Sequence, residues 1–178
     1  MRLIYGGLSL ERLGLYGFRL CANGDCLCVD ANACDRRLYT HDHHRDGEGI
    51  GPQGLEPWRQ FEVDKWLVTP IPAYNTVKRP DGGVPHPMGC CFGYLIERAG
   101  VKVLIAGDTD LTPELTKTRG VDILAVPIGG GGVMTPEEAA EAVMSIRPKI
   151  AVPYHYTDRK HYVLFRDIAQ PYTQIIGV

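Results

Sequence analysis

The sequence predicts an α/β (α+β) fold in which β-sheets are covered by helices. The first half of the chain is rich in short apolar runs joined by turns, as expected for hairpins. The second half alternates buried apolar runs with two helical segments. At 178 residues, the chain can bury a substantial core but is too short for two comfortable domains. We therefore expect residues 1–178 to form a single domain.

The composition argues against several classes of function. The chain has 19 basic and 21 acidic side chains, so charge gives no reason to expect binding to nucleic acid or to a membrane surface. No apolar run approaches the roughly 20 residues of a transmembrane helix, and the first 17 residues lack the order of a signal peptide. We expect a cytoplasmic protein that binds neither nucleic acid nor membrane. Its oligomeric state stays open.

The N-terminal part contains a predicted hairpin. Residues 18–22 and 26–29 are its expected strands, and Asn23-Gly24 is typical of a two-residue turn. This turn places Cys21 opposite Cys26, where a disulfide is geometrically feasible. Because free cysteine is often buried in protein cores, we interpret these cysteines as small core side chains.

The middle of the chain is less regular. Residues 37–40 form an expected short strand, and the glycine- and proline-rich residues 47–57 exclude regular helix or strand. An apolar run at residues 66–71 predicts the next strand. The loop that follows, residues 76–89, carries His86 between two prolines.

The second half is more regular. Thr112-Pro113 opens a short predicted helix that ends before Gly120. A longer helix, residues 136–147, begins with a capping box at Thr135 and is closed by Pro148. We expect it to pack Ala140, Val143, Met144 and Ile146 on a sheet and to leave Glu137, Glu138 and Glu141 near water. The predicted strands are residues 92–97, 101–106, 121–127, 150–154 and 174–178.

A histidine-rich segment, residues 38–46, follows the strand at residues 37–40. In extended backbone, His41 and His43 would point to the same side, and two imidazoles so placed suit a metal such as zinc. Downstream, Asp108 and His155 follow apolar strands, and His86 lies in its proline-restricted loop. Strand ends are rigid supports for metal ligands. The sequence therefore predicts a metal site.

The order of these motifs resembles the metallo-β-lactamase superfamily. The motifs are T-H-x-H at residues 40–43, H-P-x-G-x-x-x-G-Y at 86–94, A-G-D-T-D at 106–110 and P-x-H-Y at 153–156. The chain looks most similar to small, stand-alone metal-dependent hydrolases, a branch that includes lactonase-like members. The resemblance implies an αββα sandwich: two mixed sheets face to face, with helices outside and a metal site at one edge.

The resemblance also implies the ligands. His41, His43 and His86 would form a three-histidine site, Asp108 would bridge two metals, and His155 would serve the second metal. One or two zinc ions are implied, although manganese or iron would also suit such ligands.

Arg45 and Asp46 stand where the family places an aspartate and then a histidine. A guanidinium cannot become a metal ligand. Two arrangements remain open. In the one we favour, Arg45 turns away to pair with a carboxylate such as Asp42, and Asp46 becomes a ligand beside Asp108 and His155. In the other, the second metal is absent and Asp108 joins the three histidines.

The implied activity is hydrolysis of a small ester, lactone or phosphodiester by metal-activated water, because a metal lowers the pKa of bound water to roughly 7. Asp46 or Asp108 would orient or deprotonate the water. Asn75, Tyr156 and His161 are candidates for substrate contact, although a surface position is the simpler interpretation for Tyr156 and His161.

Two other functions compete with this hypothesis. A non-catalytic protein that binds one metal or none is favoured by Arg45, and the metal content of purified protein would separate it from the enzyme. A nuclease is disfavoured by the balanced charge. The glycines at 129–132 could present amides to an anion, but a tight loop before a helix is the simpler interpretation.

Overall fold

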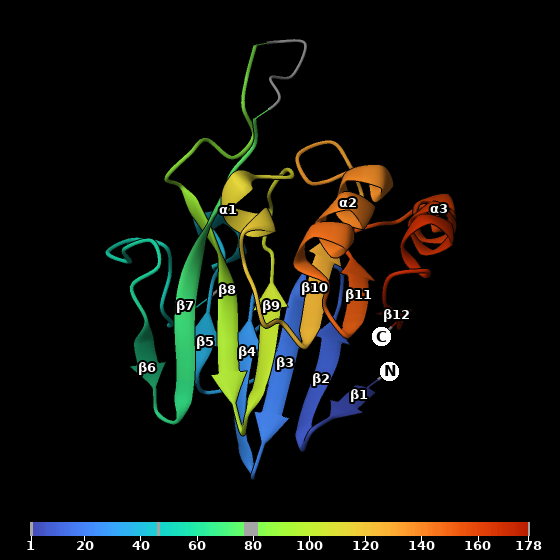
Figure 1. The fold of residues 1–178 in the computed structure, drawn as a ribbon. Coiled ribbons are helices and arrows are strands. Elements are labelled where there is room, and N and C mark those ends of the chain that lie inside the picture. Colours follow the sequence, from blue (N-terminus) through green and yellow to red (C-terminus); the bar gives the residue numbers. More distant parts are fainter. Residues whose placement is uncertain (1, 46, 77–81, 178) are drawn as a thin grey trace.

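The computed structural model describes residues 2–45, 47–76 and 82–177, and consists of two β-sheets packed face to face (Figure 1). The five-stranded sheet has the order β1-β2-β3-β4-β5. Its strands are β1 (Arg2–Tyr5), β2 (Leu8–Leu13), β3 (Gly17–Ala22), β4 (Asp25–Val29) and β5 (Arg37–Leu38). All pairs are antiparallel except β4 with β5, which is parallel. The strand expected at residues 37–40 is shorter than predicted, because β5 covers Arg37–Leu38 alone.

The seven-stranded sheet has the order β12-β11-β10-β9-β8-β7-β6. The strands β6 to β9 pair antiparallel, and β9 to β12 pair parallel, so both sheets are mixed as predicted. The strands are β6 (Phe61–Val63), β7 (Trp66–Ala73), β8 (Cys91–Arg98), β9 (Val101–Ile105), β10 (Ile123–Pro127), β11 (Ile150–Tyr154) and β12 (Gln174–Ile175).

Two apolar layers hold the fold together. The first lies between the sheets and joins residues such as Leu10 and Leu20 to Val103 and Val152. The second lies between the seven-stranded sheet and the helices α1 (Pro113–Thr116), α2 (Pro136–Ile146) and α3 (Arg159–Ala169). These helices lie on one side of the molecule (Figure 1). The two-sheet sandwich with outer helices is confirmed, and in the described part of the chain the helices cover the seven-stranded sheet alone.

The predicted hairpin is present as β3 and β4. Cys21 pairs with Cys26 across the turn, and Asn23 and Gly24 both have positive φ, as a two-residue hairpin turn requires. Our interpretation of these cysteines as free core side chains is wrong, because Cys21 and Cys26 form a disulfide with a Cα–Cα distance of 4.2 Å. Two further disulfides join Cys28 to Cys34 and Cys90 to Cys91.

The helix α2 agrees with its sequence prediction. Thr135 and Glu138 form a reciprocal capping box at its start, and Arg147 ends it in a left-handed conformation. Ala140, Val143 and Ile146 are buried, Met144 is half-buried and Glu141 is exposed. The helix α3 was not predicted. Its start signal was Asp158, whose side chain caps the amide of Lys160.

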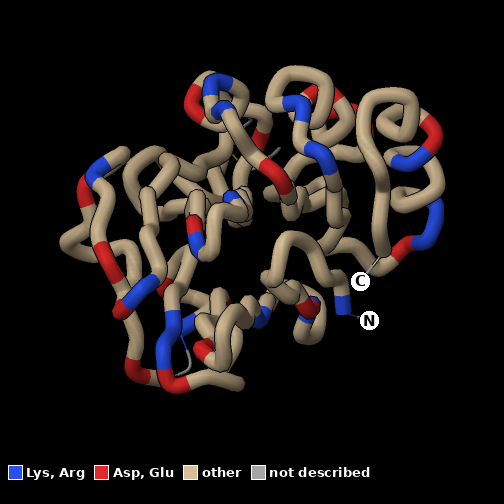
Figure 2. Tube along the Cα trace, turned by 60° about the horizontal axis from the view of Figure 1, so that its bottom comes forward, with Lys and Arg blue, Asp and Glu red and all other residues tan. Residues whose placement is uncertain are grey.

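Acidic and basic residues are interspersed along the chain (Figure 2). Within the described residues, no helix has the length and apolar character needed to cross a membrane.

Candidate metal centre

The candidate centre lies at one end of the sandwich, where several strands finish. The strands β9 and β11 are parallel neighbours of β10 and run toward the same end, upward in Figure 1. Asp108 follows β9, and His155 follows β11. Thr40 and His41 follow β5, and the backbone amide of Phe92 in β8 donates to the Thr40 carbonyl at 2.9 Å, which ties the two sheets together here. The topology thus gathers residues that are far apart in sequence.

Asp108 lies at the centre of a cluster that it forms with His41, His86 and His155. Its Oδ2 atom lies 3.6 Å from Nε2 of His41, 3.6 Å from Nε2 of His86 and 3.5 Å from Nε2 of His155. Asp108 and His41 are buried, at 5% relative exposure each. Donor atoms bound tetrahedrally at about 2.0–2.1 Å from zinc are about 3.3–3.4 Å apart, so the observed spacing fits a transition metal. One carboxylate with imidazoles is a donor set suited to zinc.

His86 is held by Asn75. The Oδ1 atom of Asn75 accepts from the His86 backbone amide at 3.0 Å and lies 2.9 Å from its Nδ1. Nδ1 also lies 3.2 Å from the Gly132 carbonyl. With the proton on Nδ1, the Nε2 atom facing Asp108 keeps its lone pair for a metal. Asn75 is buried and donates its Nδ2 to Asp110 and to Gly132, so it lies behind His86.

The histidine-rich segment does not form a strand. Residues Asp42–His44 form a 3₁₀ turn, η1, in which the His44 amide donates to the His41 carbonyl. The expectation that His41 and His43 share a face by strand alternation is therefore wrong, because a 3₁₀ turn brings residues i and i+3 together. The His41 and His44 ring centroids are 3.8 Å apart, whereas those of His41 and His43 are 5.5 Å apart.

His43 is exposed and lines a cavity of about 160 Å³ together with His41 and His86. Among the described residues, the compact groups of candidate ligands are His41, His86 and Asp108, and separately Asp30, His41 and His44. His43 belongs to neither group, and its ligand role stays a prediction.

Arg45 and Asp46 have different outcomes. Arg45 is exposed, and its Nε donates to the Gly47 carbonyl at 3.5 Å. Asp42 is contacted by Gln53 at 3.3 Å, and no ion pair between Asp42 and Arg45 is found in the described residues. The predicted pairing of Arg45 with Asp42 is not found among the described residues, and the choice between the two arrangements stays a prediction. Asp46, proposed as ligand and catalytic residue, lies outside the described residues.

Tyr156 and His161 lie beside the cluster rather than on a remote surface. Together with His155 and Gly129, they line a second cavity of about 210 Å³. The glycine at 129 is a packing requirement, since a Cβ there would lie 2.1 Å from the carbonyl oxygen of His155. The Gly130 amide donates to the Met134 carbonyl at 3.0 Å, so the loop closes on itself, as the simpler interpretation predicts.

The electrostatic environment favours metal binding. Burial, reinforced by the charge of His44, lowers the pKa of His41 to about 4, and burial also lowers the pKa of His86. Burial would raise the pKa of Asp108, but contact with His155 outweighs burial and lowers it. At neutral pH, His41 and His86 are therefore neutral while Asp108 is ionised, which are the protonation states that bind metals. His155 differs, because burial would lower its pKa but the contact with Asp108 outweighs burial and raises it, so a metal must displace a proton there.

Sequence reasoning missed three residues beside the cluster. Asp30 follows β4, so the rule that drew attention to Asp108 could have found it. His44 lies in the histidine-rich segment, but the alternation expected of a strand would place it on the face opposite His41. Tyr16 lies in the β2–β3 turn, where its ring centroid is 4.6 Å from those of His44 and His155, and no local sequence signal marks it.

Comparisons with known proteins agree with the fold. Residues 34–156 match the family described as the beta-lactamase superfamily domain. A UPF0173 protein of Pyrococcus furiosus is 52% identical over 147 residues, which are 68% of this chain and 66% of that protein. A UPF0173 metal-dependent hydrolase of Thermococcus onnurineus is 38% identical over 99 residues, 53% of this chain and 42% of that protein.

A solved structure from Parabacteroides distasonis superimposes with a TM-score of 0.82 at 24% identity, covering 96% of this chain and 92% of the other. This likeness concerns the fold. The matches with the two curated relatives span about two fifths to two thirds of their length.

Proposed function

Because this chain belongs to the beta-lactamase superfamily, we propose that it is a metal-dependent hydrolase whose centre is built around Asp108. The observation that carries this proposal is the convergence of three imidazole Nε2 atoms, from His41, His86 and His155, on one carboxylate oxygen. The relative of this chain from Thermococcus onnurineus is named a metal-dependent hydrolase, which supports metal-dependent hydrolysis as the reaction class.

The metal we propose is zinc, held by the compact group of His41, His86 and Asp108. His155, whose Nε2 lies 3.5 Å from Asp108, and His43 at the rim are further candidate ligands. When bound, such a metal lowers the pKa of water and polarises the substrate oxygen. Asn75 orients His86 by engaging its Nδ1, so we reassign it from substrate contact to positioning. Asp108 supplies the negative charge of the centre, because its pKa is lowered.

The substrate we propose is a small ester, lactone or phosphodiester. Cavities of about 160 Å³ and 210 Å³ flank the cluster, and volumes of this size suit small molecules. Tyr156 and His161 line the larger cavity and are placed to contact a substrate held beside His155. The chain has no excess of basic side chains that would favour a nucleic acid as substrate.

The test measures whether zinc-loaded protein hydrolyses any of three probes: p-nitrophenyl acetate, γ-butyrolactone and bis(p-nitrophenyl) phosphate. At least one probe should be turned over, and His86→Ala should abolish both the turnover and the metal that His86 holds. The control is Gln60→Ala, because the Gln60 side chain is exposed and is not a candidate ligand. Turnover of no probe by fully metal-loaded protein would favour a non-catalytic metal-binding protein instead.

A further inference from the structure

Asp30 is a buried carboxylate that binds the residue preceding His41. It follows β4 in a left-handed backbone conformation with φ of 48°, which is sparsely populated by residues other than glycine. Its side chain is 4% exposed. Oδ1 accepts from the Thr40 backbone amide at 2.8 Å, and Oδ2 accepts from the Thr40 hydroxyl at 2.6 Å. Both oxygens of one carboxylate therefore hold the same residue.

Thr40 connects this carboxylate to the His41 ring. It is fully buried, and its carbonyl accepts from the Phe92 amide of β8 at 2.9 Å, so its backbone is fixed on both sides. Its side-chain oxygen lies 3.2 Å from Nδ1 of His41. The side chains of Asp30, Thr40 and His41 therefore form one hydrogen-bonded chain.

The contact lengths give the positions of the protons in this chain. A hydroxyl has a single proton to donate, and a carboxylate is the stronger acceptor. The contact of 2.6 Å with Asp30 is also the shorter of the two, so the Thr40 proton points to Asp30. The Thr40 oxygen then accepts from His41, which places the proton of a neutral His41 ring on Nδ1. Nε2 keeps its lone pair and lies 3.6 Å from Oδ2 of Asp108.

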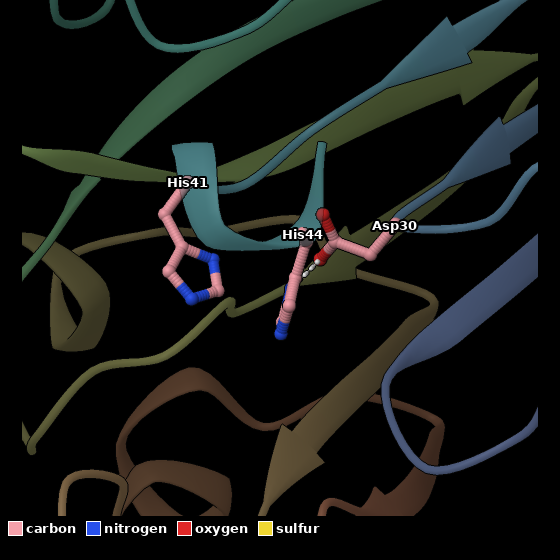
Figure 3. A group of neighbouring side chains, drawn as sticks. All are labelled: Asp30, His41 and His44. Carbon is pink, nitrogen blue, oxygen red and sulfur yellow. Dashed lines mark ion pairs between the residues drawn. The ribbon is translucent and has the colours of Figure 1, made fainter. Parts of the chain in front are cut away.

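Asp30 also belongs to a compact group with His41 and His44, shown in Figure 3, whose donor atoms lie within 4.8 Å of one another. Nδ1 of His44 lies 3.2 Å from Oδ2 of Asp30 and has no hydrogen-bond partner in the part of the chain that the structure describes. A cation held by this group would compete for His41. A neutral imidazole has one lone pair, so His41 serves one group or the other. Its Nδ1 contact with Thr40 favours the group that contains Asp108.

We propose that Asp30 and Thr40 are positioning residues that hold the proton of His41 on Nδ1 and so present Nε2 to the metal of the Asp108 centre. This inference rests on the proposed metal-dependent function. A histidine that binds a metal commonly directs its other ring nitrogen to a fixed acceptor, which sets the tautomer and makes the imidazole a stronger ligand. Here the acceptor is the Thr40 hydroxyl, and Asp30 sets the direction in which that hydroxyl donates.

The first experiment determines the tautomer of His41 by nitrogen NMR of isotope-labelled, metal-free, full-length protein at neutral pH. The His41 signals are identified by their loss in His41→Gln. The unmodified chain should carry the proton on Nδ1, and Thr40→Ser, which keeps the hydroxyl, should do the same. Asp30→Asn should move the proton to Nε2. The asparagine oxygen must still accept from the Thr40 amide, so its amide group donates to the Thr40 oxygen and turns the hydroxyl proton toward His41.

The second experiment measures zinc affinity by chelator competition. Thr40→Val removes the hydroxyl and should weaken zinc binding roughly 10- to 100-fold, the usual effect of losing such a partner, whereas Thr40→Ser should retain most of the affinity. Asp30→Asn combined with Thr40→Val should lose no more affinity than the weaker single variant, because both residues act through one chain. Thr69→Val is the matched control, since its hydroxyl has as its described contact one hydrogen bond of 3.4 Å from Gln60.

The outcomes separate this inference from the proposed function. An unmodified chain that binds no zinc, cobalt, manganese or iron would overturn both. Zinc binding with the His41 proton on Nε2, or equal zinc affinities of Thr40→Val and the unmodified chain, would overturn the inference alone. His44→Ala should bind as many ions as the unmodified chain, and the loss of one ion would favour the group of Asp30, His41 and His44 instead. If Thr40→Val does not fold, the tautomer of the unmodified chain and its change in Asp30→Asn decide.

Discussion

Replacing Asn75 with alanine tests how the centre is held together. The side chain is buried and makes four hydrogen-bonding contacts: two with His86, one with Asp110 and one with Gly132. Truncation to alanine removes all four and leaves the Nδ1 of His86 with only the more distant Gly132 carbonyl, at 3.2 Å.

The structure sets the expected size of two effects. Loss of a partner that orients a ligand typically weakens metal binding 10- to 100-fold, which is about 1.4–2.7 kcal/mol. Each net hydrogen bond contributes about 0.5–1.5 kcal/mol, and buried partners are left unsatisfied, so the metal-free protein should lose about 2–4 kcal/mol of unfolding free energy.

Two assays separate these effects. Chelator competition measures zinc affinity, and urea unfolding of the metal-free protein measures stability. Gln60→Ala is the matched control, because it removes a side-chain amide whose described contact is one hydrogen bond of 3.4 Å to Thr69 at the surface. If Asn75→Ala loses stability but keeps zinc affinity within twofold of the unmodified chain, the reasoning that Asn75 orients His86 is refuted.

Three further predictions concern the fold. Gly93→Ala should lower the unfolding free energy by about 1–3 kcal/mol in urea, because its Cβ would lie 2.4 Å from the Ala106 carbonyl oxygen; an unchanged midpoint would contradict this packing. Thr135→Ala should cost about 0.5–2 kcal/mol in the same assay by removing the α2 cap, and Thr135→Ser should retain most of that stability. Burial raises the pKa of Asp122, but the hydrogen bond from Lys149 outweighs it and lowers this pKa. The ionised Asp122 carboxylate should therefore stabilise the folded state, through its contact with Lys149, at pH values above the unfolded-state pKa of about 4. This contribution to the unfolding free energy should be lost as pH falls through the lower folded-state pKa. Asp122→Asn should remove this acid-limb dependence from a series of unfolding curves, and an identical pH profile would argue against it.

Local sequence determined much of the fold. The turn at Asn23-Gly24 set the hairpin register and placed Cys21 opposite Cys26, because a two-residue loop allows few pairings. Capping residues set the start of α2, since Thr135 and Glu138 satisfy its first amides. Apolar runs ending in Asp108 and His155 indicated two members of the cluster, because parallel strands deliver their ends to one edge of a sheet.

Tertiary structure decided the rest of the centre. The same histidine-rich segment could alternate as a strand or close as a turn, and sequence could not choose, because the choice depends on the contacts that Thr40 makes with Asp30 and Phe92. That choice brings His44, rather than His43, against His41. Tyr16 and Asp30 meet His44 because the β2–β3 and β4–β5 connections lie at the same end of the five-stranded sheet, whereas Tyr16 meets His155 only when the two sheets pack face to face. Sequence specified the candidate donors, and the packing of the two sheets determined which of them meet.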